Sequence, residues 1–271
     1  MNMRPFFVNL PLRYIATDDK YLHYFLEHGL NPEIGIDVFA VEHLSRRWHS
    51  RLARRLSEAG LVMAVHLPFQ DLHPGGIDPL IREASIERLR LGLDIAAIYS
   101  PQHLVAHALY ADTLYFNRYG QWLENSAATW TDLLARWPEG PPLYLENVYE
   151  MRPDSFADLL SLLPEDRTGF CFDIGHWHSF GGSAKTNELD NWLKILAVYL
   201  KHMHLYDNDS SGDQHLGLGQ GDIPLELLFK TLKSLKLTPT MTLEPHTEDA
   251  LLTSLCYLNN HPDWFRDLRC P

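Results

Sequence analysis

GFCFDIGH, residues 169–176, is a mostly apolar run followed by a carboxylate and, three residues later, an imidazole. Such a run before Asp173 indicates a buried strand. Gly175 is expected to permit a tight turn that brings His176 back toward the end of that strand. Alone, the Asp-x-x-His spacing fits equally an aspartate that caps a helix beside an incidental histidine. Its meaning therefore depends on what the neighbouring strands carry.

Apolar runs that end in a carboxylate or an imidazole recur on both sides of this stretch. They are residues 61–66 (LVMAVH), 103–107 (HLVAH), 143–147 (LYLEN), 201–206 (KHMHLY) and 240–244 (TMTLE), which supply His66, His107, Glu146, His204 and Glu244. A carboxylate at the end of a buried strand is costly unless it is paired or bound to a metal. Each residue alone would have an ordinary structural explanation, but their matched positions in successive units indicate a shared site.

Strand-like and helix-like segments alternate along the whole chain, which is the pattern of a parallel α/β fold. Residues 6–10 and 34–39 are two further expected strands, which makes eight with the six above. Helices are expected at residues 18–28, 79–99, 121–137, 155–163, 188–200, 225–235 and 249–258, and another carries Leu44, Trp48, Leu52 and Leu56 on one face. Eight strand–helix units predict a (β/α)8 barrel, or TIM barrel, that spans residues 1–271 as a single domain.

The carboxyl ends of the strands and the loops after them form the active face of such a barrel. Alternation along residues 201–206 points His202 and His204 to the same interior face. His204 is nearer the rim and is the expected ligand, whereas His202 is expected to be a hydrogen-bonded interior residue. The predicted site gathers nine residues: His66, His107, Glu146, Asp173, His176, His204, Asp213, His215 and Glu244. Imidazoles and carboxylates clustered in this way are typical of a metal site.

Long irregular segments are expected after the third, fourth, sixth and seventh strands, where a barrel places its substrate loops. They are residues 67–78, 108–120, 177–187 and 207–222. The last contains the Asp213-Gln-His215 pair, which by itself would also fit a polar surface loop. Five arginines at 46, 47, 51, 54 and 55 lie off the apolar stripe of their helix and are expected to face solvent rather than nucleic acid.

Composition narrows the class of protein. A formal net charge of −12 disfavours a protein that grips nucleic acid by its phosphates, although three divalent ions would leave −6. The first residues carry Arg4 and Pro5 within a short apolar stretch, which does not fit a signal peptide, and no apolar run is long enough to span a membrane. Three cysteines without a CxxC spacing indicate a cytoplasmic protein with reduced, mostly buried thiols. The oligomeric state is not indicated.

Taken together, the motifs resemble the endonuclease IV branch of the xylose-isomerase-like barrels (AP endonuclease family 2), which also includes sugar epimerases and isomerases. The resemblance covers nearly the whole chain. It is carried by AVHLPFQDLHPG (64–75), LVAH (104–107), YLEN (144–147), FDIGH (172–176), KHMHLYDND (201–209), DQHLGLGQGDI (213–223) and TLEP (242–245).

The resemblance to the endonuclease IV branch implies three divalent ions held by nine ligands. His66, His107 and Glu146 would hold the first; Glu146 would bridge to a second, completed by Asp173, His204 and Glu244; and His176, Asp213 and His215 would hold the third. Zinc is the expected metal, with manganese or iron as alternatives. Asn147 and Asp207 are expected to orient the imidazoles as hydrogen-bond partners that do not themselves bind the metal.

This ligand set favours a metal-dependent phosphoester hydrolase, because paired ions neutralise charge on the attacking and leaving oxygens. Glu146 and Glu244 are the expected catalytic residues. The loop after the third strand offers Phe69 for stacking but no lysine or arginine, and the loop after the seventh is acidic. The expected substrate is therefore a nucleotide, sugar phosphate or cofactor phosphodiester rather than DNA.

Two other functions stay open. The simpler relatives use one ion, held by the equivalents of Glu146, Asp173, His204 and Glu244, to isomerise or epimerise sugars, with the two glutamates moving a proton. One barrel hosts many chemistries, so this alternative remains. A non-catalytic binding barrel is less favoured, because every ligand position is intact.

Overall fold

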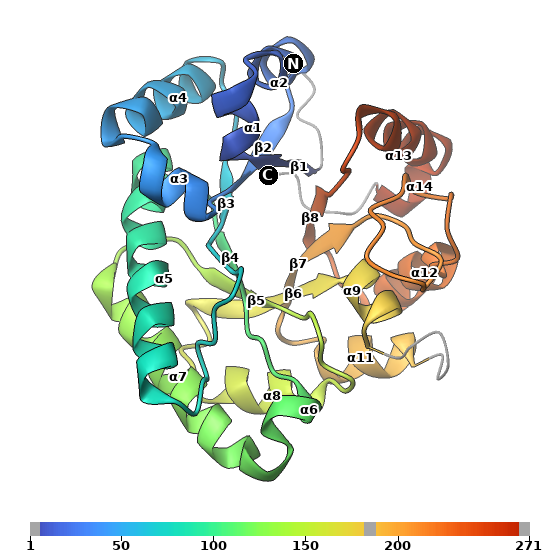
Figure 1. Ribbon diagram of the computed structural model, residues 1–271. Helices are drawn as coiled ribbons and strands as arrows, with labels where there is room; N and C mark the ends of the chain where they lie inside the picture. Colours follow the sequence, from blue (N-terminus) through green and yellow to red (C-terminus); the bar gives the residue numbers. More distant parts are fainter. Residues whose placement is uncertain (1–5, 182–187, 266–271) are drawn as a thin grey trace.

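The structure is a computed structural model that describes residues 6–181 and 188–265. In these residues eight parallel strands form one closed barrel in the order β1 to β8 (Figure 1). They are β1 (Phe7–Pro11), β2 (Asn31–Gly35), β3 (Ala64–His66), β4 (Leu104–His107), β5 (Leu143–Glu146), β6 (Thr168–Asp173), β7 (Leu200–Leu205) and β8 (Thr240–Leu243). The predicted (β/α)8 barrel is confirmed.

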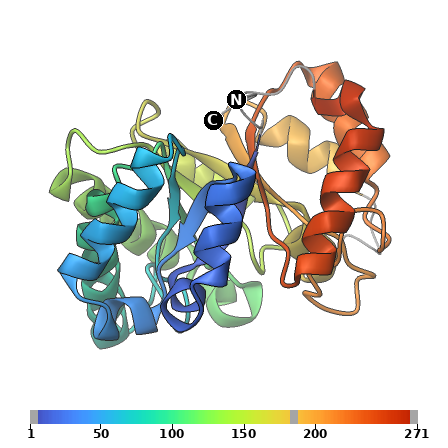
Figure 2. The ribbon, with the colours of Figure 1, turned by 90° about the horizontal axis from the view of Figure 1, so that it is seen from above.

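The helices surround the barrel as an outer ring (Figures 1 and 2). They are α1 (Leu12–Thr17), α2 (Lys20–His28), α3 (Val38–His43), α4 (Arg46–Glu58), α5 (Pro79–Tyr99), α6 (Asp112–Tyr115), α7 (Tyr119–Arg136), α8 (Asp154–Ser161), α9 (Ile174–Ser179), α11 (Leu189–Ile195), α12 (Leu225–Leu235), α13 (Glu248–Asn260) and α14 (Pro262–Phe265), with a 3-10 turn at Phe116–Arg118. No helix in the described ranges is long and apolar enough to cross a membrane.

Local signals explain why several helices begin where they do. The Asp78 carboxylate accepts a hydrogen bond from Leu80 N at 2.8 Å, and Pro79 occupies the first position of α5. Ser45 caps α4 in the same way, by accepting from Trp48 N. The predicted arginine face of α4 is exposed, while Leu52 and Leu56 are buried against the barrel.

The second strand was predicted too late in the sequence. It lies at Asn31–Gly35 rather than residues 34–39, because the Asp37 carboxylate accepts from Ala40 N and starts α3 at Val38. Pairing of Asn9 with Glu33 fixes the register of β2 against β1. As a consequence, Glu33 lies inside the barrel, where it is 2% exposed.

Two other predictions need correction. The expected loops contain short helices: α6 and the 3-10 turn lie within residues 108–120, and α9 runs into 177–187, part of which lies outside the described residues. Helix α11 ends at Ile195 rather than residue 200, because β7 already begins at Leu200. Of the cysteines, Cys171 is buried as expected, Cys256 is exposed, and Cys270 lies outside the described residues.

Candidate metal centre

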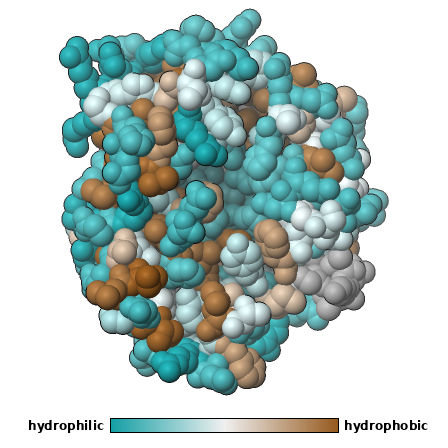
Figure 3. Space-filling view, viewed as in Figure 1, coloured by the Kyte–Doolittle hydropathy of each residue, from teal (hydrophilic) through white to brown (hydrophobic). Residues whose placement is uncertain are grey.

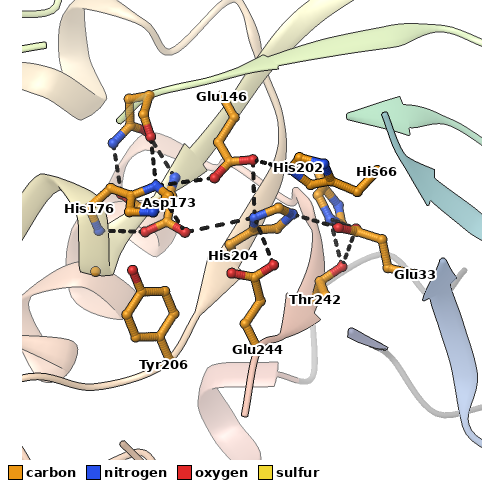
Figure 4. Close-up of polar contacts among 12 residues, drawn as sticks. Glu33, His66, Glu146, Asp173, His176, His202, His204, Tyr206, Thr242 and Glu244 are labelled. Carbon is orange, nitrogen blue, oxygen red and sulfur yellow. Dashed lines mark hydrogen bonds and ion pairs between the residues drawn. The ribbon is translucent and has the colours of Figure 1, made fainter. Parts of the chain in front are cut away.

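His204, at the carboxyl end of β7, lies at the centre of a group of carboxylates (Figure 4). Its Nδ1 atom is 3.3 Å from Glu244 Oε1, 3.4 Å from Glu146 Oε2 and 3.7 Å from Asp173 Oδ2. Within the described residues, His204 Nδ1 and Asp173 Oδ2 are buried and have no hydrogen-bond partner. Unpartnered buried donors and acceptors are rare in folded proteins. Their convergence here fits a divalent cation bound between them.

A second group adjoins the first through Glu146. His66 Nε2 lies 3.0 Å and His107 Nε2 3.4 Å from Glu146 Oε2, so one carboxylate oxygen faces three imidazoles. The other ring nitrogen of His66 donates to the carbonyl of Leu67 at 2.9 Å. With that nitrogen protonated, Nε2 is the one with a free lone pair for a metal. The ligand atoms of His66, His107 and Glu146 are close enough to share one ion.

A third group is formed by His176 of α9 and the Asp213–His215 loop. Asp213 Oδ2 lies 3.6 Å from His176 Nε2 and 3.2 Å from His215 Nε2. The other nitrogen of each ring is engaged by a backbone carbonyl, that of Asn147 for His176 and that of Glu244 for His215. His215 is held in the left-handed backbone region, at φ 50°, where few residues other than glycine lie.

The structure thus brings all nine predicted residues together, linked by contacts of 3.7 Å or less. Four of the nine stand at the ends of β3 to β6. The others are His204 in β7, Glu244 just after β8, His176 in α9, and Asp213 and His215 in the loop between β7 and α12. This set of imidazoles and carboxylates suits zinc, manganese or iron.

The two carboxylate oxygens of Asp173 face different groups. Its Oδ1 accepts from His176 N at 2.6 Å and caps α9, while Oδ2 faces His204. The helix-cap explanation of the Asp-x-x-His spacing is therefore right and does not compete with a role in the site. Asn147 steadies the same turn: it exchanges two 2.9 Å hydrogen bonds with the backbone of Asp173 and accepts from the ring of His176. The predicted support from Asn147 is confirmed.

Two predicted supporting roles differ from the structure. Gly175 lies within α9, where a Cβ would overlap the ring of Tyr206, so glycine is needed for close packing rather than for a tight turn. Asp207 contacts no imidazole among the described residues. Its carboxylate accepts from the backbone N–H groups of Gly219 and Ile223 and shapes the loop before α12.

Sequence reasoning missed Glu33. Glu33 Oε1 lies 3.0 Å from His204 Nε2, behind the ring as seen from the other carboxylates (Figure 4). Glu33 Oε2 accepts from Thr242 at 2.6 Å and lies 3.2 Å from His202 Nε2. His202 is also hydrogen-bonded to Thr240, as expected for an interior polar residue. The only sequence signal for Glu33 is an acid in a run, NPEIG, that contains proline and glycine and reads weakly as a strand.

The buried charges set the pKa values of the acids in opposite directions. Burial raises the pKa of Glu146, but the neighbouring imidazoles of His204 and His107 outweigh it and hold that pKa well below its usual range. For Glu244, burial dominates and its pKa is raised. Burial also raises the pKa of Asp173 to about 7. Burial thus disfavours the carboxylate forms of Asp173 and Glu244, and a bound divalent ion would offset that cost.

A cavity of about 1150 Å³ opens over the site (Figure 3). Its floor includes His66, Glu146 and Glu244. The ring of Phe69 also lines it, 4.4 Å from the ring of His107 and 46% exposed. The predicted stacking side chain is therefore placed beside the imidazoles. The side chain of His246, which the sequence did not single out, stacks on His215 at 3.7 Å and lines the same cavity.

Comparison with known proteins assigns the family. A model of the xylose isomerase-like TIM barrels matches residues 32–269. The chain belongs to this family. A relative, the uncharacterized protein MJ1311 of Methanocaldococcus jannaschii, is 26% identical over 189 residues, which cover 67% of this chain and 64% of MJ1311. The chain thus spans somewhat less than two thirds of that relative.

Solved structures match this chain over nearly its whole length. A D-tagatose 3-epimerase-like protein superposes with a TM-score of 0.78 at 20% identity, covering 96% of this chain and 98% of the other; this likeness shows the fold. The TTHB071 protein from Thermus thermophilus, whose crystals were soaked with ZnCl2, superposes with a TM-score of 0.72 at 26% identity, covering 95% and 97%. The predicted family is confirmed. A D-psicose 3-epimerase and an L-ribulose 3-epimerase, each 14% identical with a TM-score of 0.70, share the fold.

Proposed function

We propose that this xylose isomerase-like barrel is a divalent-metal-dependent isomerase or epimerase of sugars. The observation that carries the proposal is the placement of two carboxylates on opposite sides of His204 Nδ1, Glu146 at 3.4 Å and Glu244 at 3.3 Å (Figure 4). Both line the floor of an open cavity. The epimerases among the structural neighbours have the same fold, which supports the alternative over the hydrolase favoured by the sequence.

Glu146, Asp173, His204 and Glu244 would hold the ion, and the ion would supply polarisation of the substrate's carbonyl and adjacent hydroxyl. The carbon next to that carbonyl is then acidic enough to lose a proton. One of the two glutamates accepts this proton, and the other returns a proton to the opposite face, which inverts the carbon. His66 and His107, on the same cavity floor, are placed to hydrogen-bond sugar hydroxyls.

The hydrolase remains a second candidate because of one specific observation. His66 and His107 both lie within 3.4 Å of the Glu146 carboxylate. His176 and His215 both lie within 3.6 Å of the Asp213 carboxylate. If these groups also bind ions, two or three ions would surround the cavity floor, which suits phosphoester cleavage.

Two measurements decide between the candidates. Metal content per chain should be determined by mass spectrometry on protein purified without chelator. Incubation with ketoses in D2O should place deuterium on the carbon next to the carbonyl, and Glu146→Gln and Glu244→Gln should abolish that exchange. One ion with deuterium exchange supports the isomerase or epimerase. Two or three ions, no exchange, and release of phosphate or alcohol from phosphoesters would replace it with the hydrolase.

A variant of His215 distinguishes the isomerase or epimerase from the hydrolase without any substrate. His215→Ala should leave metal content per chain unchanged if a single ion binds at the His204 group. A loss of one ion per chain would instead show that the Asp213–His215 loop binds metal, as the hydrolase requires.

A further inference from the structure

The cavity extends well beyond the metal centre. Its volume of about 1150 Å³ exceeds the roughly 300–1,000 Å³ that is usual for pockets enclosing a whole drug-sized ligand. One monosaccharide over the carboxylates would leave much of this space to water. Part of the remaining wall is built by α1 and α2, which follow β1 in the chain and lie beside it in Figure 1.

Three tyrosines lie on this wall of the cavity. Tyr14, Tyr21 and Tyr24 line the cavity and are half-buried, so each presents part of its ring to the open space. The rings of Tyr14 and Tyr21 lie 5.3 Å apart, inclined by 33°. Each ring also has a polar neighbour: Arg13 lies 5.7 Å from the ring centre of Tyr14, Lys20 lies 5.0 Å from that of Tyr21, and the ring of His28 lies 4.3 Å from that of Tyr24. The exposed part of each tyrosine still combines an aromatic surface with a hydroxyl, the combination that binds a ring bearing hydroxyl groups.

The charges on the wall favour a neutral ligand. Among the described residues that line the cavity, the Lys and Arg side chains are Arg13, Lys20 and Arg88. Each has a carboxylate nearby: Asp37 lies 3.4 Å from Arg13, Asp18 lies 3.5 Å from Lys20, and Glu42 lies 2.6 Å from Arg88. The acids Asp71 and Glu248 also line the cavity. Each Lys or Arg side chain that lines the cavity thus has an acidic neighbour, so the lining offers a phosphate no unpaired basic side chain among the described residues.

We propose that the tyrosine wall (Tyr14, Tyr21 and Tyr24) is a second subsite that binds a neutral sugar ring linked to the sugar at the metal centre. The substrate is then a glycoside of two rings rather than a free monosaccharide. The identity of the first ring as a carbonyl-bearing sugar rests on the proposed function. The existence of the second subsite does not, because it follows from the size, rings and charges of the cavity.

The test compares one ketose with its glucosides on metal-loaded protein. The dissociation constants of D-fructose and of the linkage isomers turanose, maltulose and isomaltulose are measured by calorimetry, and deuterium exchange is followed in parallel. At least one disaccharide should bind about tenfold or more tightly than fructose. Tyr21→Ala should shrink that preference by about three- to tenfold, the size of one aromatic contact.

Tyr149 provides the matched control, because its side chain is 49% exposed and lies outside the cavity lining. Tyr149→Ala should leave the disaccharide preference unchanged. Equal affinity for fructose and every disaccharide, or a preference insensitive to Tyr21→Ala, overturns the second subsite even if deuterium exchange occurs. Tyrosine-dependent disaccharide binding without any exchange overturns the proposed function and leaves the subsite standing. Tighter binding of a nucleoside diphosphate than of every disaccharide would overturn the assignment to a neutral ring.

Discussion

At the scale of single residues, the buried contacts of Glu33 orient His204. The imidazole is held between Glu33 Oε1, 3.0 Å from Nε2, and the carboxylates around Nδ1. A carboxylate behind a metal-binding imidazole fixes which nitrogen carries the proton and raises the basicity of the other. With a metal ion at Nδ1, the ring proton would stand on Nε2, which faces Glu33 Oε1.

Glu33→Gln should therefore weaken metal binding by roughly 10- to 100-fold, the usual effect of losing such a partner. The dissociation constant for zinc can be measured by competition with a chromophoric chelator. Thr242→Val is the control, since it removes the donor to Glu33 Oε2 but leaves Oε1 beside His204. Nitrogen NMR of the wild type should show His204 protonated at Nε2. If Glu33→Gln leaves the metal affinity unchanged, Glu33 has a structural role and does not act on metal binding through His204.

Gly175 gives a second prediction at this scale. Alanine at this position must push its Cβ into the ring of Tyr206, which is fully buried against the site. Gly175→Ala should lower the free energy of unfolding by about 1–3 kcal/mol, as other overpacked cores do. Gly120→Ala is the matched control, because Gly120 also lies in a helix but nothing approaches its added Cβ within 4 Å. Urea denaturation of the two variants measures the difference, and equal stabilities would contradict the packing role.

His204 and Glu33 show what a sequence can predict about single residues. His204 ends an apolar run whose alternation fixes its direction, so its place in the site follows from local pattern alone. Glu33 sits in NPEIG, where proline and glycine obscure the strand. Its direction depends on the pairing of β2 with β1 and β3, which is a contact between distant segments.

At the scale of elements, Glu150 ties together the loops after β4 and β5. It is 1% exposed, and its carboxylate accepts from Tyr110 N at 2.8 Å and from Val148 N at 2.7 Å. Burial raises the pKa of Glu150 from its ordinary 4.5 to about 7. Between about pH 4.5 and pH 7, the Glu150 carboxyl group is therefore protonated in the folded protein and ionised in the unfolded chain.

Because the folded state binds more protons, the free energy of unfolding should fall as pH rises from about 4.5 to about 7. Glu150→Gln should remove this slope, although its amide nitrogen will face a backbone N–H and lower stability at every pH. Denaturant titrations of both proteins across that range supply the comparison. A slope that persists unchanged in the variant would assign the pH dependence to other groups.

The long helices with a periodic apolar pattern were predicted best, whether or not a side chain caps their start. Helices α5 and α12 have the predicted bounds, and α5 begins at the proline that follows its capping aspartate. The second strand was misplaced because Ile34, Ile36 and Val38 alternate as a strand would, while the capping hydrogen bond from Asp37 turns the chain into α3. The short helices α6 and α9 lack the length that gives a periodic signal.

At the scale of the whole molecule, a cation bound at one end of the barrel would stabilise the folded state, because burial there disfavours the carboxylates of Asp173 and Glu244. The chain already carries a net charge of −12. A ligand that binds the folded state alone stabilises it by about 2.7 kcal/mol at a hundredfold excess over its dissociation constant. Metal-free protein should therefore unfold at a lower temperature than loaded protein.

Thermal unfolding before and after dialysis against EDTA, and after return of zinc, tests this expectation. Magnesium chloride at equal ionic strength is the control for simple screening of charge, since magnesium prefers oxygen ligands and would not replace a metal held by imidazoles. Equal unfolding temperatures in all four samples would show that no ion is held by the folded state.

The seam that closes the barrel, between the first and last strands, is short, with as few paired residues as β3 and β4 share. Strand β1 pairs with β8 through two residue pairs, Phe7 with Thr242 and Val8 with Leu243. Glu244 follows directly after that seam. During synthesis β8 leaves the ribosome after the other seven strands, so a nascent chain lacks both this closure and the last carboxylate beside His204. A chain interrupted before residue 244 would therefore offer an ion at His204 one carboxylate fewer, in a barrel that is not closed.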